Sequence, residues 1–265
     1  MSRSPLASYR IEAYNTARES ENKIHDEGVA RRFGFKGGVV PGVDVYAYMT
    51  HHPVLLWGRA WLERGAASCR FLKPVYDGEI VTVMASESAQ GLDLRAEARG
   101  ELCAEGTASL SSKAPSPPRL FAGAPAPPAV RPLADEARLA TGTRFTINPL
   151  RVTSEFLAEA LKELREENPI YMGEGLLHPG VVLRAANSAI THNLVLSPWM
   201  HVGSEVQHLG VARIGDAVSA GALVTTNYER KGHRFVDLDV IVFAEGERPI
   251  ARIAHRAIWR LRDAA

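Results

Sequence analysis

A polar turn that carries one imidazole lies shortly before the start of an apolar helical segment. The turn covers residues 20–25, Ser-Glu-Asn-Lys-Ile-His, and the helical segment opens with Pro41 and Gly42. The side chain of His25 titrates near neutral pH, so it can accept and donate a proton under working conditions. The backbone N–H of Gly42 at a helix start can stabilise a negative charge. The sequence therefore predicts a proton-transfer group beside an anion site.

Acidic side chains near the turn and the helix start offer a second proton carrier. Asp44 stands in the first turn of the predicted helix, Glu21 lies within the polar turn, and Asp26 directly follows that turn. Acidic residues at a helix start also serve to complement the helix dipole. Glycine at the position of Gly42 is equally expected where a helix packs closely on a sheet. A chemical and a structural role thus remain open for both Asp44 and Gly42.

The composition is that of a soluble globular protein. Of its 265 residues 46% are hydrophobic, and the formal net charge is only +1, which gives no field for binding nucleic acid. The first 15 residues lack the apolar core of a secretion signal, and no apolar run approaches the length of a membrane span. We expect a cytoplasmic protein that binds neither nucleic acid nor a membrane.

Neither a disulfide framework nor a metal site is expected. Cys69 and Cys103 are too few for such a framework and stand in strand-like sequence, where free cysteines behave as small buried hydrophobic residues. The nine histidines form no His-x-x-x-His pair, and neither a Gly-x-Ser-x-Gly motif nor a dinucleotide-binding glycine pattern is present. We predict no cofactor and no metal.

The first half predicts one buried helix followed by antiparallel strands. Residues 9–15 indicate a short strand and 27–33 a short helix. Residues 41–63 are apolar nearly all round, as in a buried helix, and Pro53 should bend this helix or end its first section. Further strands are predicted from apolar and polar alternation at 67–72, 80–85 and 92–110, the last divided at Gly100. This order suggests a sheet wrapped around the helix.

A proline-rich segment separates two similar halves. The predicted units are residues 1–112 and 143–265, joined by an extended linker at 113–142 that crosses the surface and builds no core. Residues 168–171 repeat the pattern of the polar turn, and Pro179-Gly180 repeats that of Pro41-Gly42. Strands then recur at 217–226, 235–243 and 250–261. A duplicated unit implies a pseudo-twofold arrangement, in which the second copy replaces the partner of a homodimer.

Two stretches of the first half resemble a known family. Residues 22–42, together with Arg-Phe-Leu-Lys-Pro-Val-Tyr-Asp-Gly-Glu at 70–79, are similar to the MaoC-like, R-specific enoyl-CoA hydratase branch of the hot-dog superfamily. The resemblance covers about the first 110 residues well and the second half more weakly. It implies an α+β double hot-dog fold with two antiparallel sheets, each wrapped around a long central helix.

The resemblance also implies which residues form the site. In the family the turn reads Asp-x-Asn-Pro-Ile-His, and a glycine amide at the start of the next helix binds the thioester oxygen. By this match His25, Asn22 and Gly42 are the predicted catalytic residues, and Asp44 is a candidate second proton carrier. Ser20 stands at the aspartate position and is expected to contact the substrate.

The second half departs from the motif in a different way. Glu166 stands at the aspartate position and Gly180 matches the glycine, but Tyr171 replaces the histidine. Tyr171 either pairs with Glu166 in a second pocket or fills that pocket. His178, just before the Pro-Gly pair, either faces a ligand or caps the helix. These four residues are expected to contact the substrate of a second site.

Three functions follow as expectations. The resemblance implies a MaoC-like hydratase or dehydratase with a remodelled site, acting on a thioester of coenzyme A or acyl-carrier protein. Hot-dog proteins also hydrolyse thioesters, and Asp44, Glu166 or His178 could direct the water in such a reaction. Because neither half carries the complete motif, a non-catalytic acyl-binding or assembly subunit is the third. The protein is expected as a monomeric pseudo-dimer or a homo-oligomer of that unit.

Overall fold

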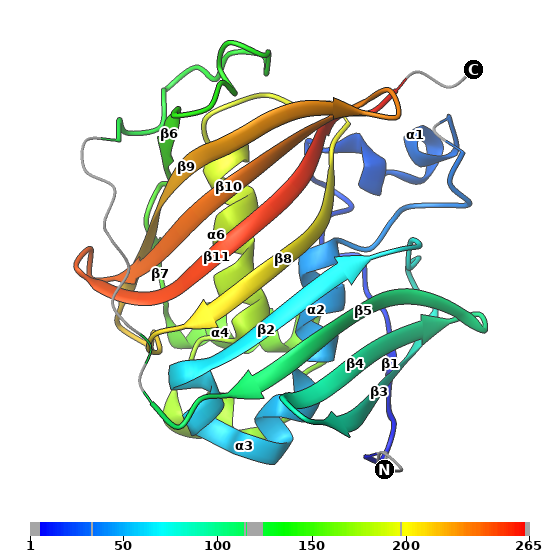
Figure 1. Cartoon of the computed structure of the whole chain (residues 1–265), viewed down its shortest axis with the longest axis vertical. Coiled ribbons are helices and arrows are strands. Elements are labelled where there is room, and N and C mark those ends of the chain that lie inside the picture. The colour runs from blue at the N-terminus through cyan, green and yellow to red at the C-terminus, as the bar shows by residue number, and fades with distance from the viewer. Residues whose placement is uncertain (1–5, 33, 114, 116–123, 197, 263–265) are drawn as a thin grey trace.

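One antiparallel sheet forms the frame of the protein (Figure 1). The computed structural model describes residues 6–262 except 33, 114, 116–123 and 197, and within that part the sheet has eleven strands. The strands are β1 (Tyr9–Glu12), β2 (Gly65–Phe71), β3 (Ile80–Ser88), β4 (Gly91–Ala98), β5 (Glu101–Leu110), β6 (Arg144–Thr146), β7 (Leu150–Arg151), β8 (Met200–His208), β9 (Ala217–Arg230), β10 (His233–Ala244) and β11 (Arg248–Arg260).

The two halves of the chain share this sheet. Its order is β1-β3-β4-β5-β2-β8-β11-β10-β9-β6, with β7 also paired to β9. The halves meet at the antiparallel pair of β2 and β8, where Ala67 lies opposite Val206. This pairing occupies backbone groups that β2 would otherwise expose at a sheet edge. The prediction of two separate sheets is therefore corrected to one continuous sheet.

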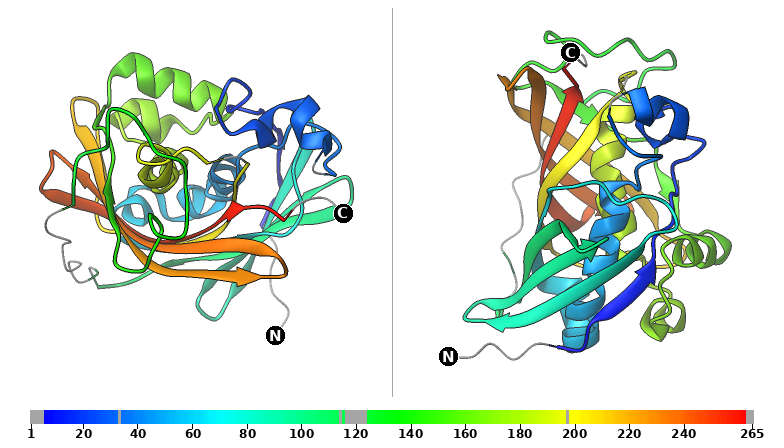
Figure 2. Two further views of the ribbon diagram at one scale, coloured as in Figure 1. Left: turned by 90° about the horizontal axis from the view of Figure 1, so that it is seen from above. Right: turned by 90° about the vertical axis from the view of Figure 1, so that its right-hand side faces the viewer.

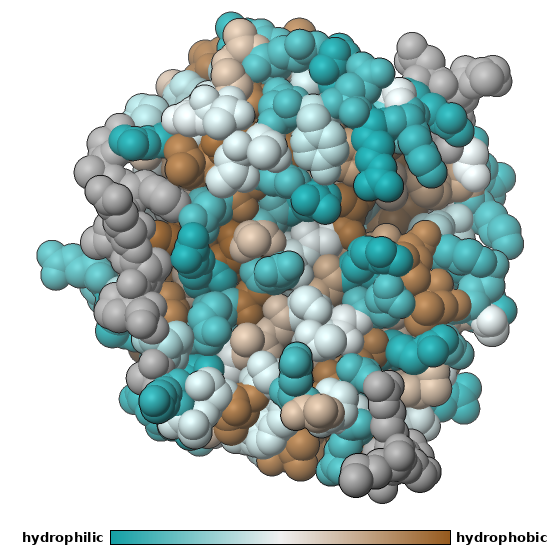
Figure 3. Space-filling view, in the orientation of Figure 1, coloured by the Kyte–Doolittle hydropathy of each residue, from teal (hydrophilic) through white to brown (hydrophobic). Residues whose placement is uncertain are grey.

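The helices cover one face of the sheet (Figure 2). Along β4, Leu92, Leu94 and Ala96 are buried, and the residues between them are more exposed, as a half-buried strand requires. The outer face, toward the viewer in Figure 3, mixes hydrophilic and hydrophobic residues. It carries cross-strand ion pairs such as that of Arg252 with Asp239. The apolar core thus lies between the sheet and the helices.

Two central helices, one from each half, pack against each other on that covered face. They are α2 and α6. They lie so close that a Cβ atom added to Gly180 of α6 would be only 2.5 Å from the Cβ of Ala47 in α2. The helices are α1 (Glu27–Arg32), α2 (Gly42–Met49), α3 (His51–Arg64), α4 (Ser154–Glu163), α5 (Pro169–Glu174) and α6 (Pro179–Thr191), with a 3₁₀ turn η1 (Lys23–His25).

The predicted long helix of the first half is divided. It ends as α2 at Met49 and resumes as α3 at His51, and Gly58 within α3 has non-helical backbone angles. Pro53 lies in the first turn of α3, where proline is tolerated because the N–H that it lacks would have no helical acceptor. The first half therefore has a short central helix followed by a second helix. The long central helix of the prediction is found only in the second half.

The segment before the second half is partly built into the fold. Ala134 donates its backbone N–H to the carbonyl of Val195, and Leu139 is fully buried in the core. The expectation that residues 113–142 build no core is therefore wrong at Leu139. The three strands predicted in the second half are confirmed as β9, β10 and β11, whereas β8 and α4 were not predicted. Among the described residues, no helix combines the length and the apolar character that a membrane span needs.

Candidate functional site

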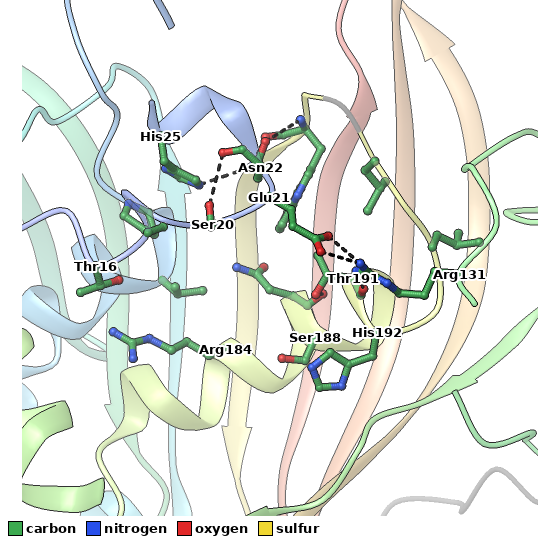
Figure 4. A pocket seen from close by; sticks show the side chains of 17 residues that line it. Thr16, Ser20, Glu21, Asn22, His25, Arg131, Arg184, Ser188, Thr191 and His192 are labelled. Atoms are coloured by element: carbon green, nitrogen blue, oxygen red, sulfur yellow. Dashed lines mark hydrogen bonds and ion pairs between the residues drawn. The ribbon is translucent and has the colours of Figure 1, made fainter. Parts of the chain in front are cut away.

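A cavity of about 320 Å³ lies between the two halves (Figure 4). The first half contributes the polar turn and the start of α2, and the second half contributes one side of α6 and the loop that follows it. Arg131 of the linker completes the wall. The lining residues are Thr16, Ala17, Ser20, Glu21, Asn22, His25, Pro41, Val43, Arg131, Arg184, Asn187, Ser188, Thr191, His192, Leu194, Leu196 and Trp199.

His25 presents a basic nitrogen in this cavity. Its Nδ1 lies 2.6 Å from the carbonyl oxygen of Val39, so this nitrogen carries the proton and donates it. The other ring nitrogen, Nε2, therefore holds the lone pair and accepts an N–H of the Asn22 side-chain amide at 3.3 Å. Burial lowers the pKa of His25, while the bond to Val39 and the charge of Asp44 only partly oppose this effect. The imidazole is thus neutral near pH 7 and can act as a base.

Asn22 ties the polar turn to the second half of the chain. Its side-chain amide donates to the carbonyl of Trp199 at 3.0 Å and accepts from the N–H of Trp199 at 3.3 Å. The same amide nitrogen is the group that approaches His25 Nε2. Asn22 therefore sets the position of His25 relative to the cavity wall that the second half supplies.

Asp44 is close to the cavity but does not line it. It is fully buried and accepts hydrogen bonds from Thr16 Oγ1 at 2.6 Å and from a guanidinium nitrogen of Arg184 at 2.8 Å. Both carboxylate oxygens are thus occupied by cavity-lining residues. The expectation of Asp44 as a direct proton carrier stays a prediction, and its contacts fit a role in holding Arg184 and Thr16 in place.

Ser20 lines the cavity and Gly42 lies beside it. Gly42 is in the first turn of α2, between the cavity-lining residues Pro41 and Val43, and an N–H in a first helical turn has no acceptor within the helix. A Cβ at this position would lie 2.8 Å from the ring of Phe71, so close packing also requires the glycine. Ser20 lines the cavity, and its hydroxyl donates to the carbonyl of Asn22 at 3.3 Å.

Comparison with known proteins finds similarity in structure. No family model matches the chain, and no curated protein matches it. A double hot-dog protein from Mycobacterium tuberculosis is 14% identical, with a TM-score of 0.63 and 96% of both chains covered. A protein from Chloroflexus aurantiacus described as a MaoC domain dehydratase is 10% identical, with a TM-score of 0.60 and coverage of 98% of this chain and 95% of that one. A protein from Novosphingobium aromaticivorans described as a thioesterase is 15% identical, with a TM-score of 0.53 and 96% of both chains covered.

The chain has a double hot-dog fold. The predicted resemblance is therefore confirmed at the level of the fold, and the similar structures include MaoC-like dehydratases as well as thioesterases. Each hot-dog unit contributes one central helix, and the cavity lies where the turn of the first unit meets α6 of the second.

The second hot-dog unit places its motif residues in the interior. Tyr171 and His178 are fully buried, with ring centroids 4.6 Å apart. Glu166 lies 3.6 Å from His178 Nε2 and 3.8 Å from His51 Nδ1, measured from its carboxylate oxygens. Tyr9 stacks on His51 at 3.8 Å. Two imidazole rings thus face the carboxylate, each against a tyrosine ring, and none of these residues lines the cavity described above.

Burial and hydrogen bonds set the protonation states of His178 and Glu166 in this interior group. His178 Nδ1 accepts the N–H of Gly180 at 3.0 Å, so His178 caps α6 and the Gly180 amide is not free to bind a substrate. Burial lowers the pKa of His178 despite the neighbouring Glu166. Burial alone would raise the pKa of Glu166, but His178, His51 and the N–H of Asn168 hold it well below its ordinary value. The four residues predicted to contact a second substrate form a buried structural cluster.

The part of the site that sequence reasoning missed comes from the second half. Arg184, His192 and Trp199 line the cavity, as does Arg131 of the linker. One signal was available, since Arg184 is the one charged residue in the otherwise apolar and small-residue sequence of α6. A charged residue within a buried helix needs a partner of opposite charge, and Asp44 of the other central helix is that partner.

Proposed function

We propose that the cavity is the active site of a hydratase or dehydratase that acts on an acyl thioester of coenzyme A or acyl-carrier protein. The observation that carries the proposal is the bond from His25 Nδ1 to Val39, which leaves the basic lone pair on Nε2 at the cavity wall, where its partner in the absence of substrate is the amide N–H of Asn22 at 3.3 Å. A neutral imidazole with a fixed tautomer is suited to remove a proton from water. Apolar residues such as Val43, Leu194 and Leu196 give an acyl chain a place to bind.

One base is sufficient for the reaction that we propose. His25 Nε2 takes a proton from water while the water oxygen bonds to the β-carbon of the enoyl thioester. The electron pair of the double bond moves toward the thioester oxygen and forms an enolate. The imidazolium then returns its proton to the α-carbon, so that one molecule of water has been added in total. Dehydration is the reverse sequence.

The start of α2 supports the enolate in this proposal. Its oxygen would bind at the N–H of Gly42, where the first helical turn offers unpaired amide donors and the positive end of the helix dipole. Asn22 and Asp44 then act as positioning residues, because Asn22 bridges to Trp199 and Asp44 holds Arg184. Ser20 in place of a carboxylate is consistent with a mechanism in which His25 carries the proton in both steps.

Thioester hydrolysis is less well supported by the lining of the cavity. A carboxylate base for hydrolysis would have to reach the water that attacks the thioester carbon, and Glu21 is the one carboxylate among the lining residues of the described chain. Glu21 is bound to Arg131 through both of its oxygens. Asp44, Glu166 and His178, the candidates from the sequence, all lie outside the lining.

Replacement of His25 by Asn tests the proposal. The shorter amide can still donate to Val39, but it has no basic nitrogen at the Nε2 position, so we expect turnover to fall by about 10²- to 10⁴-fold. The assay follows loss of the enoyl absorbance of a short-chain 2-enoyl-CoA, with a thiol reagent as a second readout. Lys23→Ala, an exposed neighbour in the same turn, is the matched control.

The possible results separate the candidate functions. Hydration consumes the enoyl group and leaves the thioester intact, whereas hydrolysis releases free thiol. Binding of acyl-CoA without either change would indicate an acyl-binding subunit. Full activity of the folded His25→Asn variant would refute the role of His25.

A further inference from the structure

Two arginines reach the cavity, and their charges are balanced in different ways. Arg184 pairs at 2.8 Å with Asp44, whose side chain is fully buried. Arg131 pairs with Glu21, whose side chain is 70% exposed. A buried carboxylate cannot leave its partner without a large desolvation cost, whereas an exposed carboxylate can move into water. Arg131 is therefore the arginine whose anion can be exchanged.

The guanidinium of Arg131 is held in place independently of Glu21. Its Nη1 donates to the carbonyl of Thr191 in the last turn of α6 at 2.7 Å. The backbone next to it is fixed, because the carbonyl of Pro132 accepts from the N–H of Val195. The side chain is only 28% exposed. A donor that is already oriented binds an anion at a lower entropic cost.

The bonds of Glu21 show what such an anion would contact. Arg131 Nη2 lies 2.7 Å from one oxygen of Glu21 and 2.6 Å from the other. The charge of Arg131 also reaches the cavity, because together with burial it lowers the pKa of His192. A ligand oxyanion at this place would therefore meet a positive charge and directed N–H donors.

We propose that Arg131 is a specificity-determining residue that binds an oxyanion of the acyl-thioester ligand, and that Glu21 occupies this place when no ligand is bound. The proposal rests on the function proposed above and adds the chemistry of the ligand. In Figure 4 Arg131 and His25 lie on opposite sides of the cavity, and the side chain of Glu21 reaches toward Arg131. The anionic group would thus bind away from the reacting carbon.

A carboxylate or a phosphate can supply this oxyanion. The carboxylate would be the far end of a dicarboxylic acyl chain, and the phosphate would belong to the coenzyme A carrier. Four unreactive thioethers distinguish these sources, namely S-butyl and S-(4-carboxybutyl) derivatives of coenzyme A and of pantetheine. Calorimetric titration measures their dissociation constants with the wild-type protein and with Arg131→Gln and Glu21→Gln variants.

A bound carboxylate and a bound phosphate predict different changes in the dissociation constants of the four ligands. If the site binds the carboxylate, Arg131→Gln weakens only the two carboxybutyl ligands, by about 10- to 100-fold, and Glu21→Gln strengthens their binding severalfold. If it binds phosphate, Arg131→Gln weakens both coenzyme A ligands by a similar factor and leaves the pantetheine ligands unchanged. Arg138→Gln is the matched control, since Arg138 forms an exposed ion pair with Asp135 on the same segment and does not line the cavity.

Other changes in these dissociation constants would show that Arg131 does not bind an oxyanion of the ligand. Equal affinity of the wild type and the Arg131→Gln variant for all four ligands, or equal weakening of all four, would mean that Arg131 only anchors the linker. Failure of the wild-type protein to bind any of the four would also overturn it. The proposed function is judged separately, by turnover of an enoyl thioester and its dependence on His25, so the two can fail independently.

Discussion

At the scale of single residues, the amide of Asn22 connects the two hot-dog units. It pairs with both backbone groups of Trp199, a residue 177 positions later in the chain. Asn22→Ala leaves that N–H and carbonyl without partners in a buried place, so we expect the free energy of unfolding to fall by about 2 kcal/mol. Urea denaturation measures this change. Lys23→Ala should change it by less than about 0.5 kcal/mol, and equal stabilities of the two variants would contradict the role of Asn22.

Replacement of Asp44 should affect stability strongly and activity weakly. Asp44→Asn removes the buried one of two carboxylates that balance Arg184, the other being Glu163 at 3.6 Å, so we expect a loss of about 3 kcal/mol in unfolding free energy. Turnover of the folded variant should fall far less than in His25→Asn, because Asp44 does not line the cavity. In a double-mutant cycle, Arg184→Gln added to Asp44→Asn should cost less than the sum of the single changes. Additive costs would show that the pair does not interact.

These residues also show how far the sequence predicts the site. Three motif residues, Ser20, Asn22 and His25, line the same cavity and Gly42 lies beside it, because they belong to a local turn and the helix after it. The motif could not give the partner of Asp44, which lies 140 residues away. Contacts across the two units depend on how the helices cross, and a local pattern does not contain that information.

At the scale of elements, β8 is the longest of the three strands that the sequence did not reveal, the others being the short β6 and β7. The strands found by alternation place apolar side chains toward the core, as Val81 and Val83 do in β3. In β8 three of the buried inward positions are His201, Ser204 and His208, so the apolar alternation is lost. His201 and His255 both bond to the hydroxyl of Ser204. A strand whose core-facing residues are polar and paired only in three dimensions does not follow the pattern on which the prediction depends.

The close contact of the two central helices should make the free energy of unfolding sensitive to side-chain size at Gly180. Gly180→Ala would place a methyl group 2.5 Å from the Cβ of Ala47, and overpacking of this kind costs about 1–3 kcal/mol. Ala47→Gly in the same chain should restore part of that loss, since it removes the opposing methyl group. Urea denaturation of the single and double variants measures both effects. Gly173→Ala is the control, because its Cβ would meet nothing within 4 Å; a destabilisation as large as that of Gly180→Ala would speak against the packing argument.

At the scale of the whole molecule, duplication has produced two units with different interiors. The turn of the first unit borders a cavity, whereas the corresponding residues of the second unit are buried around Tyr171 and Glu166. The two central helices contribute to this difference. Arg184 of α6 and Tyr46 of α2 each stand four residues after the matching glycine of their unit, but Arg184 lines the cavity and Tyr46 is buried. The turn of one unit therefore borders a cavity, and the other unit supplies its second wall.

Buried histidines near the seam between the units make the whole fold sensitive to acid. Burial lowers the pKa of His208 to about 4 and that of His255 to about 3, from an ordinary value near 6.5. Both are thus neutral in the folded protein. Once the pH falls below about 6.5, the unfolded chain takes up protons that the folded protein cannot, and each group then costs about 1.4 kcal/mol per pH unit. The stability that they give is complete above pH 6.5 and is lost as the pH falls toward 4 and 3.

Urea denaturation at pH 7.5, 6.5, 5.5 and 4.5 tests this sensitivity. We expect little change between the first two values and a steep fall of the denaturation midpoint below them. His208→Phe keeps an aromatic ring against Trp61, which His208 contacts at 4.7 Å between ring centroids, but it removes the titrating group. The slope with pH should therefore become shallower in this variant, by about 1.4 kcal/mol per unit between pH 6 and 4. A wild-type midpoint that stays constant down to pH 4.5 would mean that these imidazoles take up protons without leaving the folded interior, and the seam would then have to open to water in the native state.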